Sequence, residues 1–194
     1  KQNIFERAET AAKDAELRYR LGINNRAQDQ TENSGSTELD AVNRRFNEQL
    51  ETLTEKNADN IILNIGTPSS ILLACGIPER RIALYGNKLI KKAKHHGYQI
   101  SDVKDLPEYI NSPIAIFQGS YENGFAILTE MPINNSNALV TIDISKGEIQ
   151  DLNLVSSVFD KKKIGILKWI EQGKLLYINK EKALNYLSSS APIA

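Results

Sequence analysis

The sequence predicts an α+β fold: helices come first, and a curved antiparallel sheet follows, with a helix inserted before its last strand. Apolar residues at helical spacing mark the segment that begins at Leu39. After Pro113, apolar runs of strand length alternate with turns rich in Asn and Gly. A further helical pattern, around Leu167, separates the last two strand-like runs.

Residues 1–36 are predicted to form a charged helix and a polar linker. The run from Ile4 to Leu21 has only a thin apolar stripe, and Gly22 suits the end of a helix. The stretch 24–37 is rich in amides and serine and has no apolar period, which is typical of a linker or disordered loop.

Residues 37–194 are predicted to be a single α+β domain led by an amphipathic helix over 37–58. The apolar residues of this helix follow one another at spacings of three, four, four and three: Leu39, Val42, Phe46, Leu50 and Leu53. We expect this stripe to pack on the domain behind it. A coiled-coil partner helix is the alternative, although two heptads are too few to establish one.

Gly and Pro residues divide the next part of the chain into short helices and strands. Thr67 is the expected N-cap of a short helix, with Pro68 at its first position. Another short helix is expected to start at Ser101-Asp102 and to break at Pro113. The expected elements are strand 61–65, helix 68–74, strand 81–85, helix 87–96 and helix 101–110.

An antiparallel meander is predicted after Pro113, because each strand-like run ends at a turn signal such as Asn134-Asn135 or Lys146-Gly147. A helix, a strand and a last helix complete the domain. The predicted strands are 114–118, 125–131, 139–145, 149–159 and 175–179, and the predicted helices are 162–172 and 180–187.

Composition excludes several classes of protein. The formal net charge is +0, so affinity for nucleic acid or an anionic membrane would need a local patch. The single cysteine, Cys75, cannot form an intrachain disulfide, which fits a reducing compartment. No apolar run reaches the roughly 20 residues that span a bilayer. The start lacks Met and a signal-peptide pattern, so we expect a fragment of a longer protein.

No metal or cofactor is predicted. The sequence has no CxxC or HExxH motif, and two adjacent histidines with one cysteine do not make a zinc site. Gly66-Thr67-Pro68-Ser69 resembles a phosphate-binding turn only loosely, because it lacks the glycine spacing and the lysine of a P-loop. A capped helix start is the simpler interpretation of this turn.

The predicted helix 87–96 carries the first group of residues suited to chemistry. Its buried stripe is Leu89, Ile90 and Ala93, and the opposite side carries Lys88, Lys91, Lys92 and His95. His96 ends the helix, where the helix dipole favours its charged form, and it can act as acid or base near pH 7. The alternative is a solvated helix with a terminal histidine.

A second group surrounds the predicted helix 162–172. Lysines can neutralise phosphates, hydroxyls can bind phosphate oxygens, and a tyrosine can stack on a base or donate a proton. With one histidine, these residue types would suffice for metal-free RNA cleavage. Alternatively, the lysines form a solvated turn and Tyr177 lies in the core. The group consists of Ser156, Ser157, Lys161, Lys162, Lys163, Tyr177 and Lys180.

Several short pieces between Leu39 and Lys182 resemble a module at the C-terminal ends of large proteins of phages and Bacteroides-type conjugative elements, related to the MuF C-terminal domain. They are FNEQL (46–50), LNIGTPS (63–69), CGIP (75–78), the helix 88–96, LP (106–107), SPIAIF (112–117) and GKLLYINK (173–180). The resemblance implies a fold like that of barnase, EndoU and RelE-type nucleases, and a role as an RNA-cleaving toxin.

The same resemblance implies site residues at His96, Ser156 or Ser157, Lys162 and Tyr177. Barnase-like sites pair a Glu with the His, and only Glu122 and Glu130 are candidates for that Glu here. RelE-type sites depend instead on basic residues and a Tyr, which this chain has. A barnase-type mechanism is therefore harder to place on the sequence than the fold is.

The leading hypothesis is a metal-independent, toxin-like endoribonuclease domain of a larger phage or mobile-element protein. His96, Tyr177 and Ser157 would be catalytic, and Lys88, Lys92, Lys162 and Lys180 would bind phosphates. The rivals are a non-catalytic binding or packaging module and an NAD-using toxin such as an ADP-ribosyltransferase. The expected partners are RNA (tRNA or ribosome-associated), an immunity protein and domains of the parent protein. The expected location is the cytoplasm of a bacterial host, or a virion that carries the domain.

Overall fold

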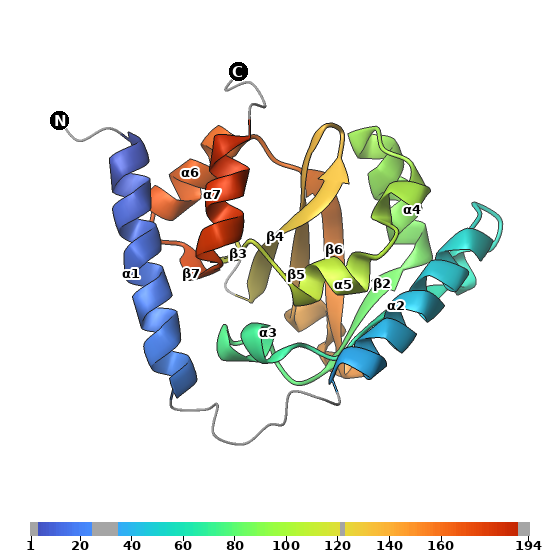
Figure 1. Ribbon diagram of the computed structural model, residues 1–194. Helices are drawn as coiled ribbons and strands as arrows, with labels where there is room; N and C mark the ends of the chain where they lie inside the picture. The colour runs from blue at the N-terminus through green and yellow to red at the C-terminus, as the bar shows by residue number, and fades with distance from the viewer. Residues whose placement is uncertain (1–3, 25–34, 121–122, 190–194) are drawn as a thin grey trace.

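The protein is described by a computed structural model over residues 4–24, 35–120 and 123–189. Seven strands of this part form one sheet in the order β1-β2-β6-β5-β4-β3-β7, with helices on both sides (Figure 1). The strands are β1 (Ile62–Gly66), β2 (Arg81–Tyr85), β3 (Ala115–Gln118), β4 (Gly124–Ile133), β5 (Ser136–Asp143), β6 (Leu152–Asp160) and β7 (Leu175–Ile178).

The helices are α1 (Ile4–Asn24), α2 (Gly35–Thr52), α3 (Ser70–Ala74), α4 (Gly86–His96), α5 (Leu106–Asn111), α6 (Lys163–Glu171) and α7 (Lys180–Ser188). In the same described ranges, three short 3₁₀ helices accompany them: η1 (Ala58–Asn60), η2 (Ile100–Val103) and η3 (Ser145–Gln150). The predicted α+β class is confirmed, and so is the helix inserted before the last strand. The sheet is largely antiparallel, but β2 pairs with β6 in parallel, which makes it mixed.

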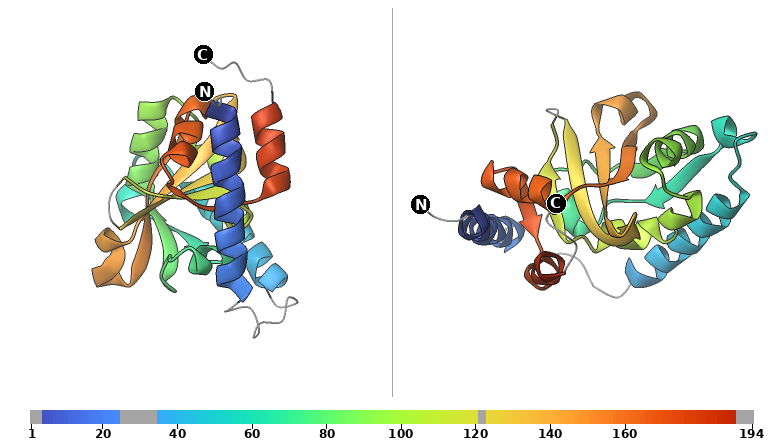
Figure 2. Two further views of the ribbon diagram at one scale, coloured as in Figure 1. Left: turned by 90° about the vertical axis from the view of Figure 1, so that its left-hand side faces the viewer. Right: turned by 90° about the horizontal axis from the view of Figure 1, so that it is seen from above.

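Two hydrophobic cores lie on the two faces of the sheet. The first core contains Phe46 of α2, Leu89 of α4 and Ile110 of α5, with Val140 and Val158 of the sheet. The second core contains residues of α1, α6 and α7 and the opposite sides of β3, β4 and β7. Viewed from above, α1 and α6 lie to one side of the central strands, and α4 and α2 to the other (Figure 2).

The apolar stripe of α2 is used inside the chain. Phe46 is 0% exposed, and Leu50 and Leu53 are buried beside it in the first core. The expectation that this stripe packs on the domain is therefore confirmed for these three residues. A dimer formed through Phe46 would have to take this side chain out of its own core.

The first helix packs on the rest of the chain. α1 contacts β7 and α6, and its small residues Ala8 and Ala15 are buried in the second core. Tyr19 of α1 lies edge-on to Tyr177 of β7, with ring centroids 4.5 Å apart. Small side chains let a helix approach closely, so a stripe that looks thin in the sequence can still be buried. Of the predicted linker, residues 25–34 lie outside the described part.

Two predicted helix starts are corrected. Ser69, not Thr67, is the N-cap of α3, and its hydroxyl accepts a hydrogen bond from Leu72 N–H. The predicted helix 101–110 is divided into η2 and α5, because Asp105 adopts a left-handed conformation with φ 63°. Asn43 and Asn47 of α2 donate hydrogen bonds of 2.8 and 2.6 Å to the Asp105 carboxylate, which fixes this break.

Candidate functional site

A bulge in β6 places two serines on one face of the sheet. Thr141 of β5 is opposite Ser157 and Ile142 is opposite Val155, which leaves Ser156 as an extra residue. Val155 and Val158 both belong to the first core, so the two serines between them face the opposite side. Bulges often re-aim side chains beside functional sites.

The hydroxyls of Thr141 and Ser156 meet at this bulge, next to Ser157. The Thr141 and Ser156 hydroxyls share a hydrogen bond of 2.7 Å, while Thr141 and Ser156 are half-buried and Ser157 is buried. We call Thr141, Ser156 and Ser157 the hydroxyl patch. The patch can offer hydroxyl donors and acceptors to a ligand without charged groups of its own.

Helix α4 packs along β6, the strand that carries the bulge. β2 pairs only with the first residues of β6, as far as Leu154, and no other described strand pairs with β6 on that side. The helix that follows β2 packs there instead. Figure 2 shows α4 next to the strand in the view from above. The fold thereby brings α4 next to the strand that carries Ser156 and Ser157, about sixty positions later in the chain.

His96, the last residue of α4, is held against the end of β6. Its ring stacks on Phe159 with centroids 5.2 Å apart and an interplanar angle of 21°. Asn134, in the turn between β4 and β5, donates hydrogen bonds to the His96 carbonyl (2.8 Å) and to the Asp160 carboxylate (3.0 Å). These contacts position the imidazole from both the helix and the sheet.

The environment of His96 favours the neutral imidazole. Burial is the main cause of a lowered pKa, and the charges of His95 and Lys92 lower it further, whereas Asp160 acts in the opposite direction. The sequence led us to expect the charged form, because a helix C-terminus stabilises cations. Burial and the neighbouring cations outweigh that effect. A neutral imidazole near pH 7 can accept a proton.

Two lysines extend this site along α4. Lys88, Lys92 and His96 recur every four residues, so they share one side of the helix, and we call them the α4 row. Lys88 is half-buried, and burial lowers its pKa, with a further contribution from Lys146 and an opposing one from Asp143 at the end of β5. The row therefore presents two cations and an imidazole beside β5 and β6.

Two of the predicted site residues do not join this group. Tyr177 is buried in the first core, beside Tyr19, and its strand β7 is separated from β6 by β5, β4 and β3. At the usual strand spacing, this separation is about 19 Å. Lys180 begins α7 and lies near Glu9 of α1, whose pKa it helps Lys13 to lower. Lys162 is different: it lies at the N-cap of α6, just after β6.

Of the two glutamates suggested for a barnase-type pair, the one that the structure describes, Glu130, is paired elsewhere. Glu130 forms an ion pair of 2.7 Å with Lys182 of α7, and Glu122 lies outside the described residues. The carboxylate that does lie near the imidazole is Asp160. Sequence reasoning treated this residue only as part of a basic corner, although its position directly after a strand could have marked it.

The helix that carries the α4 row is also where a family match begins. The profile of the Phage MuF-C-terminal domain family matches residues 87–185, which is just over half of the chain. The chain belongs to this family. It is thus a phage protein domain, and the matched region runs from α4 to α7 and includes every residue of the α4 row and the hydroxyl patch. Comparison with curated proteins and with solved structures found no match.

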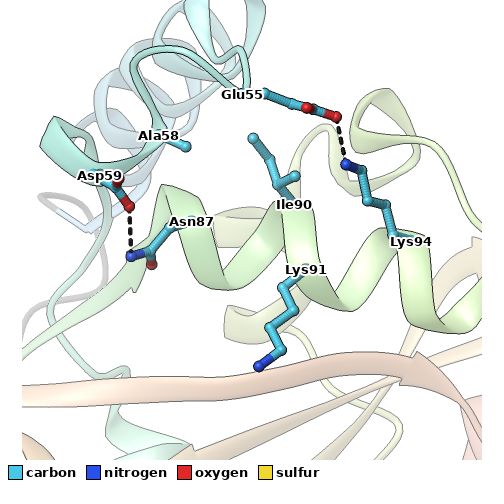
Figure 3. A pocket seen from close by; sticks show the side chains of 7 residues that line it. All are labelled: Glu55, Ala58, Asp59, Asn87, Ile90, Lys91 and Lys94. Atoms are coloured by element: carbon cyan, nitrogen blue, oxygen red, sulfur yellow. Dashed lines mark hydrogen bonds and ion pairs between the residues drawn. The ribbon is translucent and has the colours of Figure 1, made fainter.

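This MuF C-terminal domain also has a pocket of about 290 Å³ on a different side of α4 (Figure 3). Its polar walls are paired with each other, because Glu55 and Lys94 form an ion pair of 2.5 Å and Asn87 donates a 3.0 Å hydrogen bond to Asp59. The lining residues are Glu55, Ala58, Asp59, Asn87, Ile90, Lys91 and Lys94. Lys91, expected beside Lys88 and Lys92, thus belongs to this pocket.

Other kinds of site find little support in the described part of the MuF C-terminal domain. Within residues 4–24, 35–120 and 123–189, no group of three or more His, Cys, Asp or Glu side chains is placed to hold a metal ion. Burial raises the pKa of the Cys75 thiol to about 12, so this cysteine stays protonated and is a poor nucleophile near pH 7. In the same ranges, no helix has the length and apolar character needed to cross a bilayer.

Proposed function

We propose that this phage domain is an endoribonuclease that cleaves RNA with its own side chains and without a metal ion. The observation that carries the proposal is the position of His96, whose imidazole stacks on Phe159 and is kept neutral by burial and neighbouring cations. General acid–base catalysis needs a group of this kind, with a pKa near the working pH. The proposed partner is RNA, which would be met in the cytoplasm of a bacterial host.

Each residue has a role in the proposed reaction. Neutral His96 accepts the proton of a ribose 2′-hydroxyl, and the freed oxygen forms a bond to the adjacent phosphorus. The bond from phosphorus to the 5′ oxygen breaks, and the ammonium of Lys92 donates a proton to that leaving oxygen. Lys88 and the hydroxyl patch bind the negatively charged phosphate oxygens, which gain charge in the transition state. The products are a 2′,3′-cyclic phosphate and a 5′-hydroxyl.

The test compares the wild-type domain with two matched histidine variants on total RNA, purified tRNA and ribosomes, all in EDTA. His96→Ala should lower the cleavage rate by about 10²–10⁴-fold, the usual contribution of a general acid or base. His95→Ala should retain most of the activity, because His95 is exposed and does not contact Phe159. Thermal melting of both variants shows that they are folded.

Equal cleavage by the wild type and His96→Ala would refute the proposed role of His96. If no substrate is cleaved, the result favours the alternative function, a non-catalytic binding or packaging module. A parallel assay of NAD consumption tests the remaining class, an ADP-ribosyltransferase. Consumption of NAD that survives His96→Ala would also refute the nuclease proposal.

A further inference from the structure

The only tryptophan of the chain, Trp169 of α6, lies beside two lysines. The Lys161 ammonium is 4.4 Å from the centroid of the Trp169 ring, and the Lys174 ammonium is 5.7 Å from it. Trp169 is half-buried, and its ring also contacts Phe117 of β3 at 5.5 Å. We call Trp169, Lys161 and Lys174 the tryptophan cluster.

The cluster holds uncompensated positive charge. Among the described residues, neither Lys161 nor Lys174 forms an ion pair or a side-chain hydrogen bond with an acidic group. Burial lowers the pKa of Lys161, and the charge of Lys174 lowers it further, so the two ammonium groups repel each other. An anion bound between them would relieve this repulsion.

Gly165 shapes the path of Lys161 over α6. A Cβ atom at Gly165 would lie 2.9 Å from Lys161 Cε and 3.3 Å from its Nζ, so the absence of a side chain there leaves room for the lysine. Gly165 and Trp169 are one helical turn apart, and the lysine chain therefore passes along α6 to reach the indole. This arrangement places a cation and an aromatic ring side by side.

The chain itself links this cluster to His96. Phe159, on which His96 stacks, is separated from Lys161 only by Asp160, so the Cα atoms of Phe159 and Lys161 are at most about 7 Å apart. The row of paired residues Phe117, Ala126, Thr141 and Ser157 connects the same two places across the sheet. A ligand on Trp169 would therefore lie within a few nucleotide lengths of the imidazole.

We infer that the tryptophan cluster binds one nucleotide of a single-stranded RNA, with the base on the indole and the flanking phosphates on Lys161 and Lys174. Aromatic rings beside cations are the usual platform for single-stranded nucleic acids, because every base has a π-face and every linkage has a charge. The inference deepens the proposed function and rests on it, since it assigns the substrate class as single-stranded RNA next to the cleaved bond.

The fluorescence of Trp169 reports binding at the cluster directly, because the chain has no other tryptophan. The full chain is titrated with a 2′-O-methyl oligoribonucleotide, which cannot be cleaved through its 2′ oxygen, and the intrinsic fluorescence is followed. Saturable quenching is expected. Lys161→Met should weaken binding at least tenfold. Lys168→Met, which removes an exposed charge from α6, the helix of Trp169, should change it less than twofold.

Four outcomes would overturn the inference. Absence of quenching, or equal weakening by both lysine variants, would mean that the cluster does not contact the strand. Equally tight binding of inorganic tripolyphosphate, or of an acidic peptide, would mean that no base is recognised. Quenching without any RNA cleavage would refute the proposed nuclease but not this binding site. Cleavage without quenching would refute the binding site but not the nuclease.

Discussion

Neighbouring residues of β5 belong to two different environments. Ile142 is 1% exposed in the first core, whereas Thr141, the residue before it, is half-buried and shares a hydrogen bond with Ser156 on the other face. On β6, Val155 and Val158 face the first core while the serines between them do not. The two faces of these strands thus differ at this point: one is apolar and belongs to the first core, and the other combines residues of the second core, such as Leu139, with the hydroxyls of the patch.

The comparison extends to the aromatic residues. Tyr177, which the sequence suggested as a catalytic group, lies in the first core, while Phe159 and Trp169 lie on the side of the second core. Phe159 contacts His96, and Trp169 contacts two lysines. The face on which an aromatic ring lies decides whether it can meet a charged ligand, and a residue type alone does not reveal that face.

The largest expected effect is on stability, and it compares substitutions at Ile142 and Thr141, adjacent residues on opposite faces of β5. Ile142→Ala should lower the free energy of unfolding by about 3 kcal/mol, because it leaves a cavity in the first core. Thr141→Val, which keeps the shape and removes one hydroxyl, should cost about 1 kcal/mol. Urea denaturation measures both changes.

For the rate of RNA cleavage, Thr141→Val should have the larger effect of these two variants. Thr141→Val should slow RNA cleavage several-fold, while Ile142→Ala should leave the rate per folded molecule unchanged. Equal losses of stability at the two positions would show that the faces do not differ as described.

Much of this fold was predictable from local patterns. The strand 81–85 has the predicted bounds, and α4, β3 and β7 differ from the prediction by a residue. Gly97 ends α4 in a left-handed conformation, as expected of a glycine after a helix. These features depend on residues close in sequence, so spacing, caps and turn residues suffice to find them.

Features that depend on distant residues were not predictable in the same way. The parallel pairing of β2 with β6 joins positions about seventy residues apart. The orientation of Tyr177 was hidden because its strand neighbours, Leu176 and Ile178, are both apolar, so alternation does not distinguish the two faces. The break at Asp105 depends on two asparagines of α2 that no local pattern connects to it.

The second prediction concerns Asp105, where the helical segment 101–110 is broken. Its hydrogen bonds join α2 to the start of α5, and both helices cover the first core. Hydrogen bonds from Asn47 and then Asn43 lower the pKa of Asp105, opposed by partial burial. Asp105→Asn keeps a residue that tolerates a positive φ and should cost about 1.5 kcal/mol at pH 7. A group with a depressed folded pKa stabilises the fold fully above its unfolded pKa and loses this contribution as the pH falls through the folded pKa.

Consequently, the stability difference between the wild type and Asp105→Asn should shrink below about pH 4, the ordinary pKa of an aspartate. Denaturation curves between pH 3 and 7 measure it. Asp151→Asn is a matched control, because Asp151 also has a positive φ but lies at the end of η3. A difference that stays constant down to pH 3 would contradict the assigned hydrogen bonds.

The third prediction concerns the titration of His96. Since Lys92 helps to lower the pKa of His96, Lys92→Met should raise it, and the Cε1–H NMR signal of His96 should titrate at higher pH. The effect should be small, because the site is partly exposed and screened by salt. Lys94→Met is the control, since Lys94 is paired with Glu55 in the pocket.

The lowered pKa of His96 also makes the stability of the fold depend on pH. Between the folded pKa and the ordinary value near 6.5, the unfolded chain binds more protons than the folded chain. Stability should therefore fall as the pH drops below about 6.5, and His96→Gln should weaken this dependence. An unchanged pH profile would indicate that the imidazole is not buried as described.

The smallest expected effect is at Tyr177. Because this side chain lies in the first core, with three strands between β7 and β6, Tyr177→Phe should change the RNA cleavage rate by less than twofold. Phe159→Leu, on the other face, should slow cleavage by more than tenfold, since the stacking partner of His96 is lost. If Tyr177→Phe abolished cleavage while Phe159→Leu did not, the reacting groups would have to be sought on the face that carries the first core, and the α4 row would be an ordinary solvated side of a helix.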